Sequence, residues 1–305
     1  MGTPDFAVFS LRALIDAGHE IVGVITQPDK PRGRGYTLTP PPVKVTANDF
    51  SIPVYQPATL RDEAFASLLS ELCPDVCVVV AFGKILPENV LKFPKYGCIN
   101  VHGSLLPEYR GAAPMQRAII DGKSVTGITT MYMDIGLDTG DMLLSRQVEI
   151  LENDNFEDIH DKLGVCGAEL IVETLASLER GELTRTPQDP DEATYAEKIT
   201  KADCLIDFSR SAKEVHDRIR GLSPIPLSFT HTPDGKLLKI TSAKIANRDE
   251  THTECGRVIA LDDGITVACG RGAITILGVV PEGKGRMGAM DFIRGRKISV
   301  GDILN

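Results

Sequence analysis

CINVHGSLLPEYRGAAP, residues 98–114, is the stretch of this 305-residue chain from which the fold can be worked out. Its first five residues predict a strand, in which Asn100 and His102 are two positions apart and therefore project from the same face. The prolines and glycines that follow interrupt regular structure. The sequence thus predicts a strand whose carboxyl end carries an amide and an imidazole and is crossed by a loop.

A second predicted strand, residues 125–133, runs into the loop MDIGLDTGD, residues 133–141, which carries three aspartates with Asp138 in the middle. An amide donor, an imidazole and a carboxylate together suit a reaction that builds an oxyanion and moves a proton. Each of these residues alone is better explained as the end of a strand or as part of a turn. Their combination favours a catalytic site.

Further motifs follow one another in an order that resembles the folate-dependent formyltransferases. They are GTPDFA (2–7), QPDKPRGRG (27–35), PPVK (41–44), VVAFGKILP (79–87), NVH (100–102), SLLPEYRGAAP (104–114) and GLDTG (136–140). The resemblance covers nearly the whole chain. It implies transfer of a formyl group from 10-formyltetrahydrofolate to the amine of methionine esterified to initiator tRNA.

For these substrates, residue chemistry indicates a role for each residue of the site. Asn100 would donate to the developing oxyanion with help from His102, while Asp138 would orient His102 and help to remove the proton of the amine. By the resemblance, the folate slot would be formed by Phe82, Ile85, Leu86, Ser104, Leu105, Leu106 and Pro107. Without the resemblance, ordinary core packing explains the first three of these equally well.

A basic loop lies between residues 27 and 42, where Lys30, Arg32 and Arg34 stand close together among prolines and glycines. We expect these three residues to hold the acceptor end of the tRNA, with Arg34 as the leading contact. Arginine suits this task because its planar guanidinium matches phosphates and base edges. A solvated surface loop is the alternative explanation.

The charge of the chain is unevenly distributed. Its net charge is −9. From Asp191 onward there are 17 Lys and Arg against 16 Asp and Glu, which leaves 16 against 26, or −10, for residues 1–190. The acidic excess therefore lies in the first part of the chain, where the basic loop is an exception.

The composition, with 42% hydrophobic and 25% charged residues, is that of a globular protein. No run of 18 apolar residues and no charged-then-apolar leader occurs, so we expect neither membrane association nor a signal peptide. The seven cysteines are scattered and form no CxxC pair, which favours reduced thiols, a cytoplasmic location and no metal.

Helices and strands are expected to alternate over residues 1–186, which predicts an α/β domain with a doubly wound, mostly parallel sheet. A helix at 5–17 followed by a strand at 19–26 requires an earlier strand, but the sequence begins just before Gly2. The resemblance places a short apolar strand at that position. The first strand is therefore expected to be missing from the sheet.

A polar segment with two prolines predicts a linker at 187–198. After it, a helix at 211–222 precedes five short strands, which predicts a small barrel over residues 199–305. The resemblance implies that this part is OB-like and binds tRNA. We expect the protein to be a monomer.

The sequence excludes one other function and leaves two open. Gly33 and Gly35 do not begin a dinucleotide-binding fingerprint, because Leu38 stands where GxGxxG needs glycine. Formyl transfer to an amino sugar or to glycinamide ribonucleotide would keep the catalytic residues but would need neither the basic loop nor the barrel. A non-catalytic RNA-binding protein would tolerate the loss of Asn100, His102 and Asp138.

Overall fold

The computed structural model describes residues 1–32, 37–295 and 297–305. The chain forms two compact units. Unit 1 contains residues 1–111, 126–148 and 160–195, and unit 2 contains residues 112–125, 149–159 and 196–305. The boundaries predicted from the sequence, 1–186 and 199–305 with a linker at 187–198, remain a prediction.

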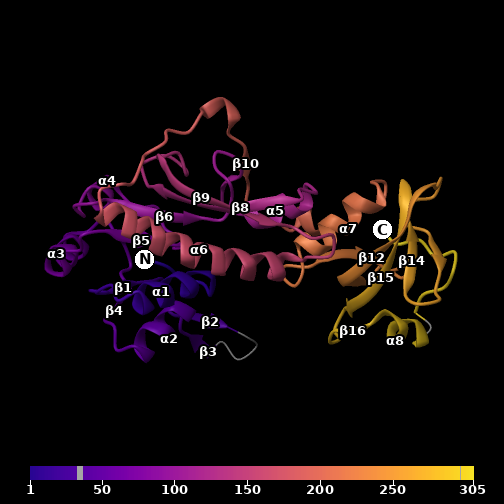
Figure 1. Ribbon diagram of the computed structural model, residues 1–305. Coiled ribbons are helices and arrows are strands. Elements are labelled where there is room, and N and C mark those ends of the chain that lie inside the picture. Colours follow the sequence, from indigo (N-terminus) through magenta and orange to yellow (C-terminus); the bar gives the residue numbers. More distant parts are fainter. Residues whose placement is uncertain (33–36, 296) are drawn as a thin grey trace. The chain divides into compact units, whose positions relative to one another are not determined.

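Unit 1 is built mainly from alternating helices and strands (Figure 1). In chain order these are α1 (Phe6–Asp16), β1 (Val24–Ile25), β2 (Lys30–Arg32), β3 (Thr37–Thr39), α2 (Pro42–Asp49), β4 (Val54–Tyr55), α3 (Glu63–Leu72), β5 (Cys77–Val79), α4 (Glu88–Leu91), β6 (Cys98–His102), β7 (Arg110–Gly111), β8 (Val125–Tyr132), β9 (Met142–Glu149), α6 (Phe156–Glu179), the 3₁₀ helix η1 (Pro190–Glu192) and β10 (Tyr195–Ala196). The predicted strand at 98–102 and the predicted helix at 5–17, which is α1, are confirmed.

The sheet that carries the candidate site has the strand order β5-β6-β8-β9. β5 and β6 run parallel, but β6 and β8 run antiparallel, with His102 opposite Thr129. The sheet is therefore mixed, and the prediction of a mostly parallel sheet was wrong at this point. The physical reason is that parallel neighbours need a crossover connection within their own unit, whereas the helix between these two strands, α5, belongs to unit 2.

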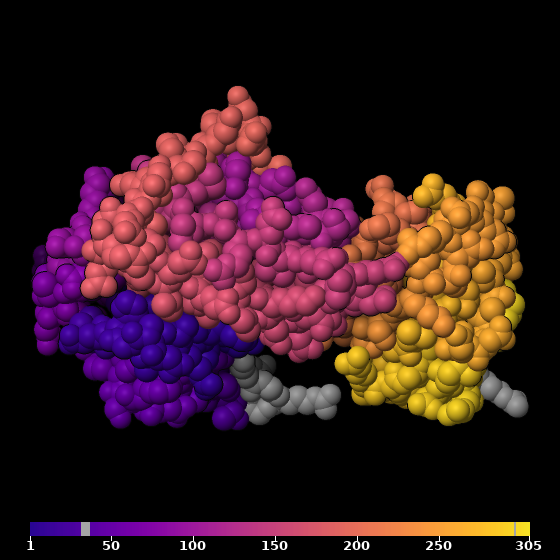
Figure 2. Space-filling model, viewed as in Figure 1, coloured from indigo at the N-terminus to yellow at the C-terminus, as the bar shows by residue number. Residues whose placement is uncertain are grey.

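The long helix α6 covers one face of this sheet (Figure 1). A Cβ on Gly167 would lie 2.9 Å from a methyl group of Val101 in β6, so the glycine permits close packing. Farther along, the hydroxyls of Thr174 and Thr130 are 2.9 Å apart. In the space-filling view, the atoms of α6 lie against those of the first residues, with little space between them (Figure 2). Among the described residues, no helix has the length and apolar character needed to cross a membrane.

Unit 2 combines helices with an antiparallel sheet. Its elements are α5 (Pro114–Ile120), the 3₁₀ helix η2 (Ala202–Cys204), α7 (Ala212–Gly221), β11 (Ser228–His231), β12 (Leu237–Thr251), β13 (Val258–Ala260), β14 (Ile265–Ala268), β15 (Arg271–Pro281), β16 (Met287–Gly288) and α8 (Ala289–Arg294). Arg117 of α5 pairs with Asp203 of η2 at 3.0 Å. A capping box formed by Ser211 and Glu214 begins α7, as expected for this sequence pattern.

The strand order in unit 2 is β11-β12-β15-β14-β13, with β16 beside β15. In the described part of the chain this is an open order, so the predicted closed OB-like barrel is not confirmed. The last residues bond to both edge strands: Asn305 exchanges backbone hydrogen bonds with His231 of β11, and Val258 of β13 donates to Asp302. Backbone bonds of the chain end thus satisfy edge groups that strand pairing leaves open.

Strands β1 and β5 do not pair with each other in the described part of unit 1. Met1 and Gly2 lie between them instead. Gly2 N donates to Ile25 O at 3.1 Å, and Val80 N donates to Met1 O at 2.9 Å. These two residues therefore supply only a short link between the two parts of the sheet.

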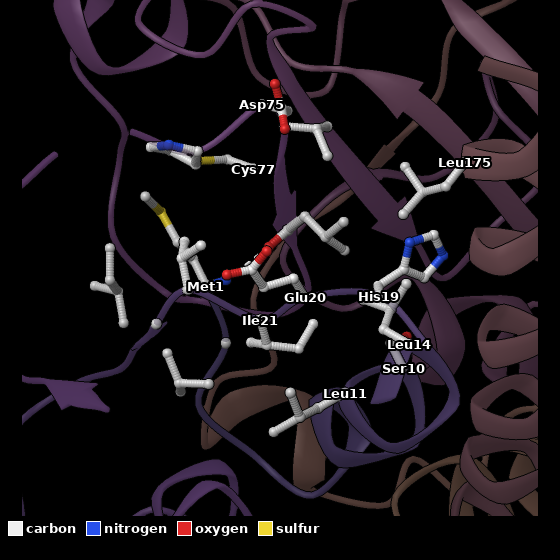
Figure 3. A pocket seen from close by; sticks show the side chains of 18 of the residues that line it. Met1, Ser10, Leu11, Leu14, His19, Glu20, Ile21, Asp75, Cys77 and Leu175 are labelled. Atoms are coloured by element: carbon white, nitrogen blue, oxygen red, sulfur yellow. Dashed lines mark hydrogen bonds between the residues drawn. The ribbon is translucent and has the colours of Figure 1, made fainter. Parts of the chain in front are cut away.

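A cavity of about 510 Å³ lies beside this link. Figure 3 shows Leu14 and Leu175 on one side of it and Cys77 on the other. The ammonium group of Met1 donates to Val78 O at 2.6 Å. Burial lowers the pKa of this amine below its ordinary value, because an apolar surrounding disfavours the charged form.

We predict that about five apolar residues added ahead of Met1 will raise the melting temperature. The added residues would fill the cavity and pair with the open edges of β1 and β5. They would also remove the buried ammonium charge of Met1. One buried Val or Ile contributes about 1.5–3 kcal/mol, and 1 kcal/mol corresponds to roughly 2–4 °C for a unit of this size. The measurement is thermal unfolding, with a Gly-Ser extension of equal length as the control.

This prediction also has a pH dependence with a definite sign. The amine binds its proton less tightly in the folded protein, so its cost is fully present below the folded pKa and disappears above the unfolded value of about 8. The advantage of the apolar extension over the unextended chain should therefore shrink as the pH rises towards 8 and stay constant above it. Equal melting temperatures for the two extensions at every pH would contradict the prediction.

Candidate active site

Asn100 is the middle residue and His102 the last residue of β6, and both are largely buried, with exposed fractions of 9% and 5%. Every residue of β6 is buried, so the strand is a rigid support. Across the sheet, Asn100 lies opposite Met131 and His102 opposite Thr129. The structure therefore places both residues on the predicted strand, with His102 at its end.

The imidazole of His102 is held from both sides. Its Nε2 lies 3.0 Å from the backbone oxygen of Tyr109. A carbonyl oxygen can only accept, so Nε2 carries the hydrogen. The other ring nitrogen, Nδ1, lies 3.7 Å from Oδ2 of Asp138. This distance is slightly longer than a hydrogen bond, and it leaves Nδ1 and the carboxylate side by side.

Asp138 reaches this position because its loop turns tightly. Its φ is 53°, in the left-handed region that aspartate tolerates better than most residues. Its Oδ2 accepts a hydrogen bond from Gly111 N at 2.9 Å. Gly140 is required nearby, since a Cβ there would lie 1.9 Å from Tyr132 O. A backbone amide and a strained turn thus fix the carboxylate.

The other two aspartates of the loop have different roles. Asp134 accepts hydrogen bonds from Gly136 N at 2.8 Å and from the hydroxyl of Thr139 at 2.6 Å. Asp141 pairs with Arg185 at 2.9 Å. The structure therefore brings only Asp138 of the three to His102.

The carboxamide of Asn100 makes no hydrogen bond within the described part of the chain. Its polar atoms are not among the fully buried side-chain atoms that lack a partner in the described residues, so they remain accessible. This amide is therefore able to donate to a ligand at the site, as an oxyanion stabiliser must.

The residues predicted to form the folate slot do not share one environment. Phe82 and Leu86 belong to the core of unit 1, with exposed fractions of 2% and 4%, whereas Ile85 is 82% exposed. Of these three side chains, Ile85 alone is open to a ligand at the surface.

The SLLP segment is fixed from β8 by a residue that the sequence did not single out. The hydroxyl of Thr129 accepts from Leu106 N at 3.1 Å and donates to Ser104 O at 2.8 Å. Ser104 in turn donates to Glu108 O at 2.6 Å. Leu105 and Pro107 remain partly exposed. The predicted slot is thus a bent loop whose backbone is bonded to the sheet.

The basic loop begins and ends in paired strands, since Lys30 lies opposite Thr39 and Arg32 opposite Thr37. Lys30 donates to Gln27 Oε1 at 2.8 Å. Arg34, the predicted leading contact to tRNA, lies outside the described residues. At the base of the loop, hydrogen bonds from Gln56 and Lys44 lower the pKa of Asp29 below its usual range.

The functional contacts that sequence reasoning missed are largely backbone groups, namely Tyr109 O and Gly111 N. Two side chains, Gln188 and Thr194, bond to the same loops. Both lie inside the segment predicted to be a linker. A backbone contact depends little on side-chain type, so no motif indicated it.

Family comparison agrees with this geometry. The formyl transferase family matches residues 1–175, and the formyl transferase C-terminal domain matches residues 198–297. Among solved structures, an N-formyltransferase from Helicobacter canadensis in complex with folinic acid and dTDP-3-aminofucose aligns with a TM-score of 0.66 at 18% identity, covering 90% of this chain and 96% of that one. HypX from Aquifex aeolicus in complex with tetrahydrofolic acid aligns with a TM-score of 0.60 at 18% identity, covering 81% and 43%. These structural matches support the fold.

Sequence relatives are much more similar. The methionyl-tRNA formyltransferase of Pelotomaculum thermopropionicum is 47% identical over 305 residues, which is 100% of this chain and 97% of the relative. That of Geotalea daltonii is 49% identical over 302 residues, covering 99% and 96%. With both family models and relatives of this similarity along its whole length, the chain belongs to the methionyl-tRNA formyltransferase family.

Proposed function

We propose that Asn100, His102 and Asp138 are the catalytic residues of this enzyme, which transfers a formyl group from 10-formyltetrahydrofolate to the amino group of methionyl-tRNA. One observation carries the proposal. An imidazole and a carboxylate are held side by side by backbone groups, next to a strand position whose amide has no bonding partner in the described part of the chain.

Each residue has a defined task. The folate supplies the formyl group, whose carbonyl oxygen becomes negatively charged as the amine attacks its carbon. Asn100 donates a hydrogen bond to that oxygen. An α-amino group has a pKa of about 8, so it must lose a proton before or during attack. Asp138 takes this proton, with His102 held beside it. The bond between the formyl carbon and nitrogen 10 of the folate then breaks, and tetrahydrofolate leaves with a proton on that nitrogen.

The folate is held by the segment from Ser104 to Pro107 together with Phe82, Ile85 and Leu86. The side chains of Ile85, Leu105 and Pro107 give it apolar surface. The buried Phe82 and Leu86 support that surface from beneath. The fixed backbone of the SLLP segment supports this assignment, because a slot for a flat ring needs rigid walls.

The tRNA is bound by Lys30, Arg32 and Arg34, and by the OB-like sheet of unit 2. The concentration of positive charge in an otherwise acidic part of the sequence supports the role of the loop. The enzyme acts as a monomer in the cytoplasm. All three catalytic residues lie in unit 1.

The acceptor can be tested directly. The assay measures formyl transfer to charged initiator tRNA, to uncharged tRNA and to a nucleotide-linked amino sugar, each with and without the folate donor. We expect product only with charged tRNA and donor together. Turnover of the amino sugar at a comparable rate would favour a small-molecule acceptor instead.

We predict that Asn100→Ala lowers the rate by roughly 10²- to 10³-fold and that Asp138→Ala and His102→Ala lower it by roughly 10²- to 10⁴-fold. Folding should be largely retained, because His102 ends its strand, Asp138 lies in a loop, and the Asn100 side chain bonds to no described residue. The measurements are single-turnover rates and melting temperatures. Asp141→Ala, in the same loop but bonded to Arg185, is the matched control. Near-normal turnover by Asn100→Ala would contradict the proposed mechanism.

We predict that Arg34→Ala weakens the use of tRNA and lowers the salt dependence of tRNA binding by about one phosphate contact. Folate binding should barely change, because the loop would contact only the acceptor. Activity is measured against tRNA concentration at two salt concentrations, with the exposed Arg61→Ala as the control. Wild-type tRNA dependence of Arg34→Ala at both salts would mean that the acceptor is held elsewhere.

A further inference from the structure

We propose that Gln188 and Thr194 are positioning residues, which hold the two loops on which His102 and Asp138 depend. The inference rests on the proposed function of that histidine and that aspartate. Neither Gln188 nor Thr194 touches either catalytic side chain; both act through backbone groups.

Gln188 joins the loop of Asp138 to the loop of Tyr109. Its Nε2 donates to Asp138 O at 2.8 Å and to Gly140 O at 2.7 Å. Its Oε1 accepts from Arg110 Nε at 3.0 Å. This set of bonds needs two donors and one acceptor on one side-chain end, which a carboxamide provides and a carboxylate does not.

Thr194 holds the neighbouring residues by three bonds. Its hydroxyl accepts from Tyr109 N at 2.8 Å. Its backbone oxygen accepts from Arg110 N at 2.8 Å, and its backbone N donates to Pro107 O at 3.3 Å. Tyr109 has a φ of 58°, a conformation that is costly for a bulky residue and persists where the surroundings enforce it.

These bonds lead directly to the site. Tyr109 O accepts from the His102 ring, and Gly111 N donates to Asp138. Because the ring and the carboxylate are 3.7 Å apart, just beyond hydrogen-bond distance, a small shift of either loop decides whether they interact. A misplacement of about 1 Å can cost roughly 10²-fold in rate.

The exposure of Gln188 and Thr194 favours a positioning role over a role in core packing. Thr194 is exposed and Gln188 is half-buried, in a segment whose other residues are mostly exposed. Neither side chain belongs to a described core cluster. Their removal should therefore affect the rate far more than the stability.

The first test replaces the amide of Gln188. Gln188→Met keeps the length without hydrogen bonds, and Gln188→Glu keeps the acceptor for Arg110 but loses both donors. We expect both variants to lower kcat by about 10- to 100-fold, with KM for donor and tRNA changed less than about twofold and the melting temperature nearly unchanged. Gln147→Met, on strand β9 of the same unit, is the matched control.

The second test uses a conservative pair at position 194. Thr194→Val has the same shape but leaves Tyr109 N without its acceptor, whereas Thr194→Ser retains the hydroxyl. We expect kcat to fall by about tenfold in the first variant and to be restored in the second. If the Gln188 variants do not fold, the two Thr194 variants still test the positioning role.

A double-mutant comparison separates this inference from the function on which it rests. If Gln188 acts through Asp138, Gln188→Met should lower the residual rate of Asp138→Ala by less than about threefold. Wild-type kcat in both Gln188→Met and Thr194→Val, with Asp138→Ala inactive, would overturn the positioning role alone. Wild-type activity of Asp138→Ala would overturn the proposed function as well.

Discussion

The hydrogen bond from His102 to the backbone oxygen of Tyr109 is the constraint on which the rest of the site depends. It links the end of β6 to a residue seven positions later, so the intervening loop must turn back over the strand. That return requires the left-handed backbone of Tyr109 and the bonds from Thr129 that hold the loop near the sheet. The same return brings Gly111 N to Asp138.

The site therefore combines a rigid support with loops that are adjusted by individual hydrogen bonds. Strand β6 is buried on both faces and is covered by α6, so Asn100 and His102 have little freedom. The carboxylate and the SLLP segment lie on loops, where position depends on a few polar contacts. Such a division lets chemistry be tuned by loop residues without changes to the core.

Sequence reasoning predicted the parts of this arrangement that depend on local pattern. The two-residue spacing of Asn100 and His102 on a strand, and the turn around Asp138, can be read from residue order. The antiparallel return of β8 could not, because it depends on where α5 packs. Gln188 and Thr194 fall in the segment predicted to be a linker, because their partners, mostly backbone groups, lie more than 45 positions away and leave no pattern in the local sequence.

Asn100 differs from the other two catalytic residues in its hydrogen bonding. Tyr109 and Gly111 satisfy His102 and Asp138, whereas the Asn100 amide has no partner in the described part of the chain. Its amide atoms are not among the fully buried polar atoms that lack a partner in the described residues, so they remain accessible at the site. Folding of the described residues therefore leaves the hydrogen bonds of this amide available to a ligand. The amide is best explained by a bond that forms only when substrate is bound, which is the requirement for preferential stabilisation of a transition state.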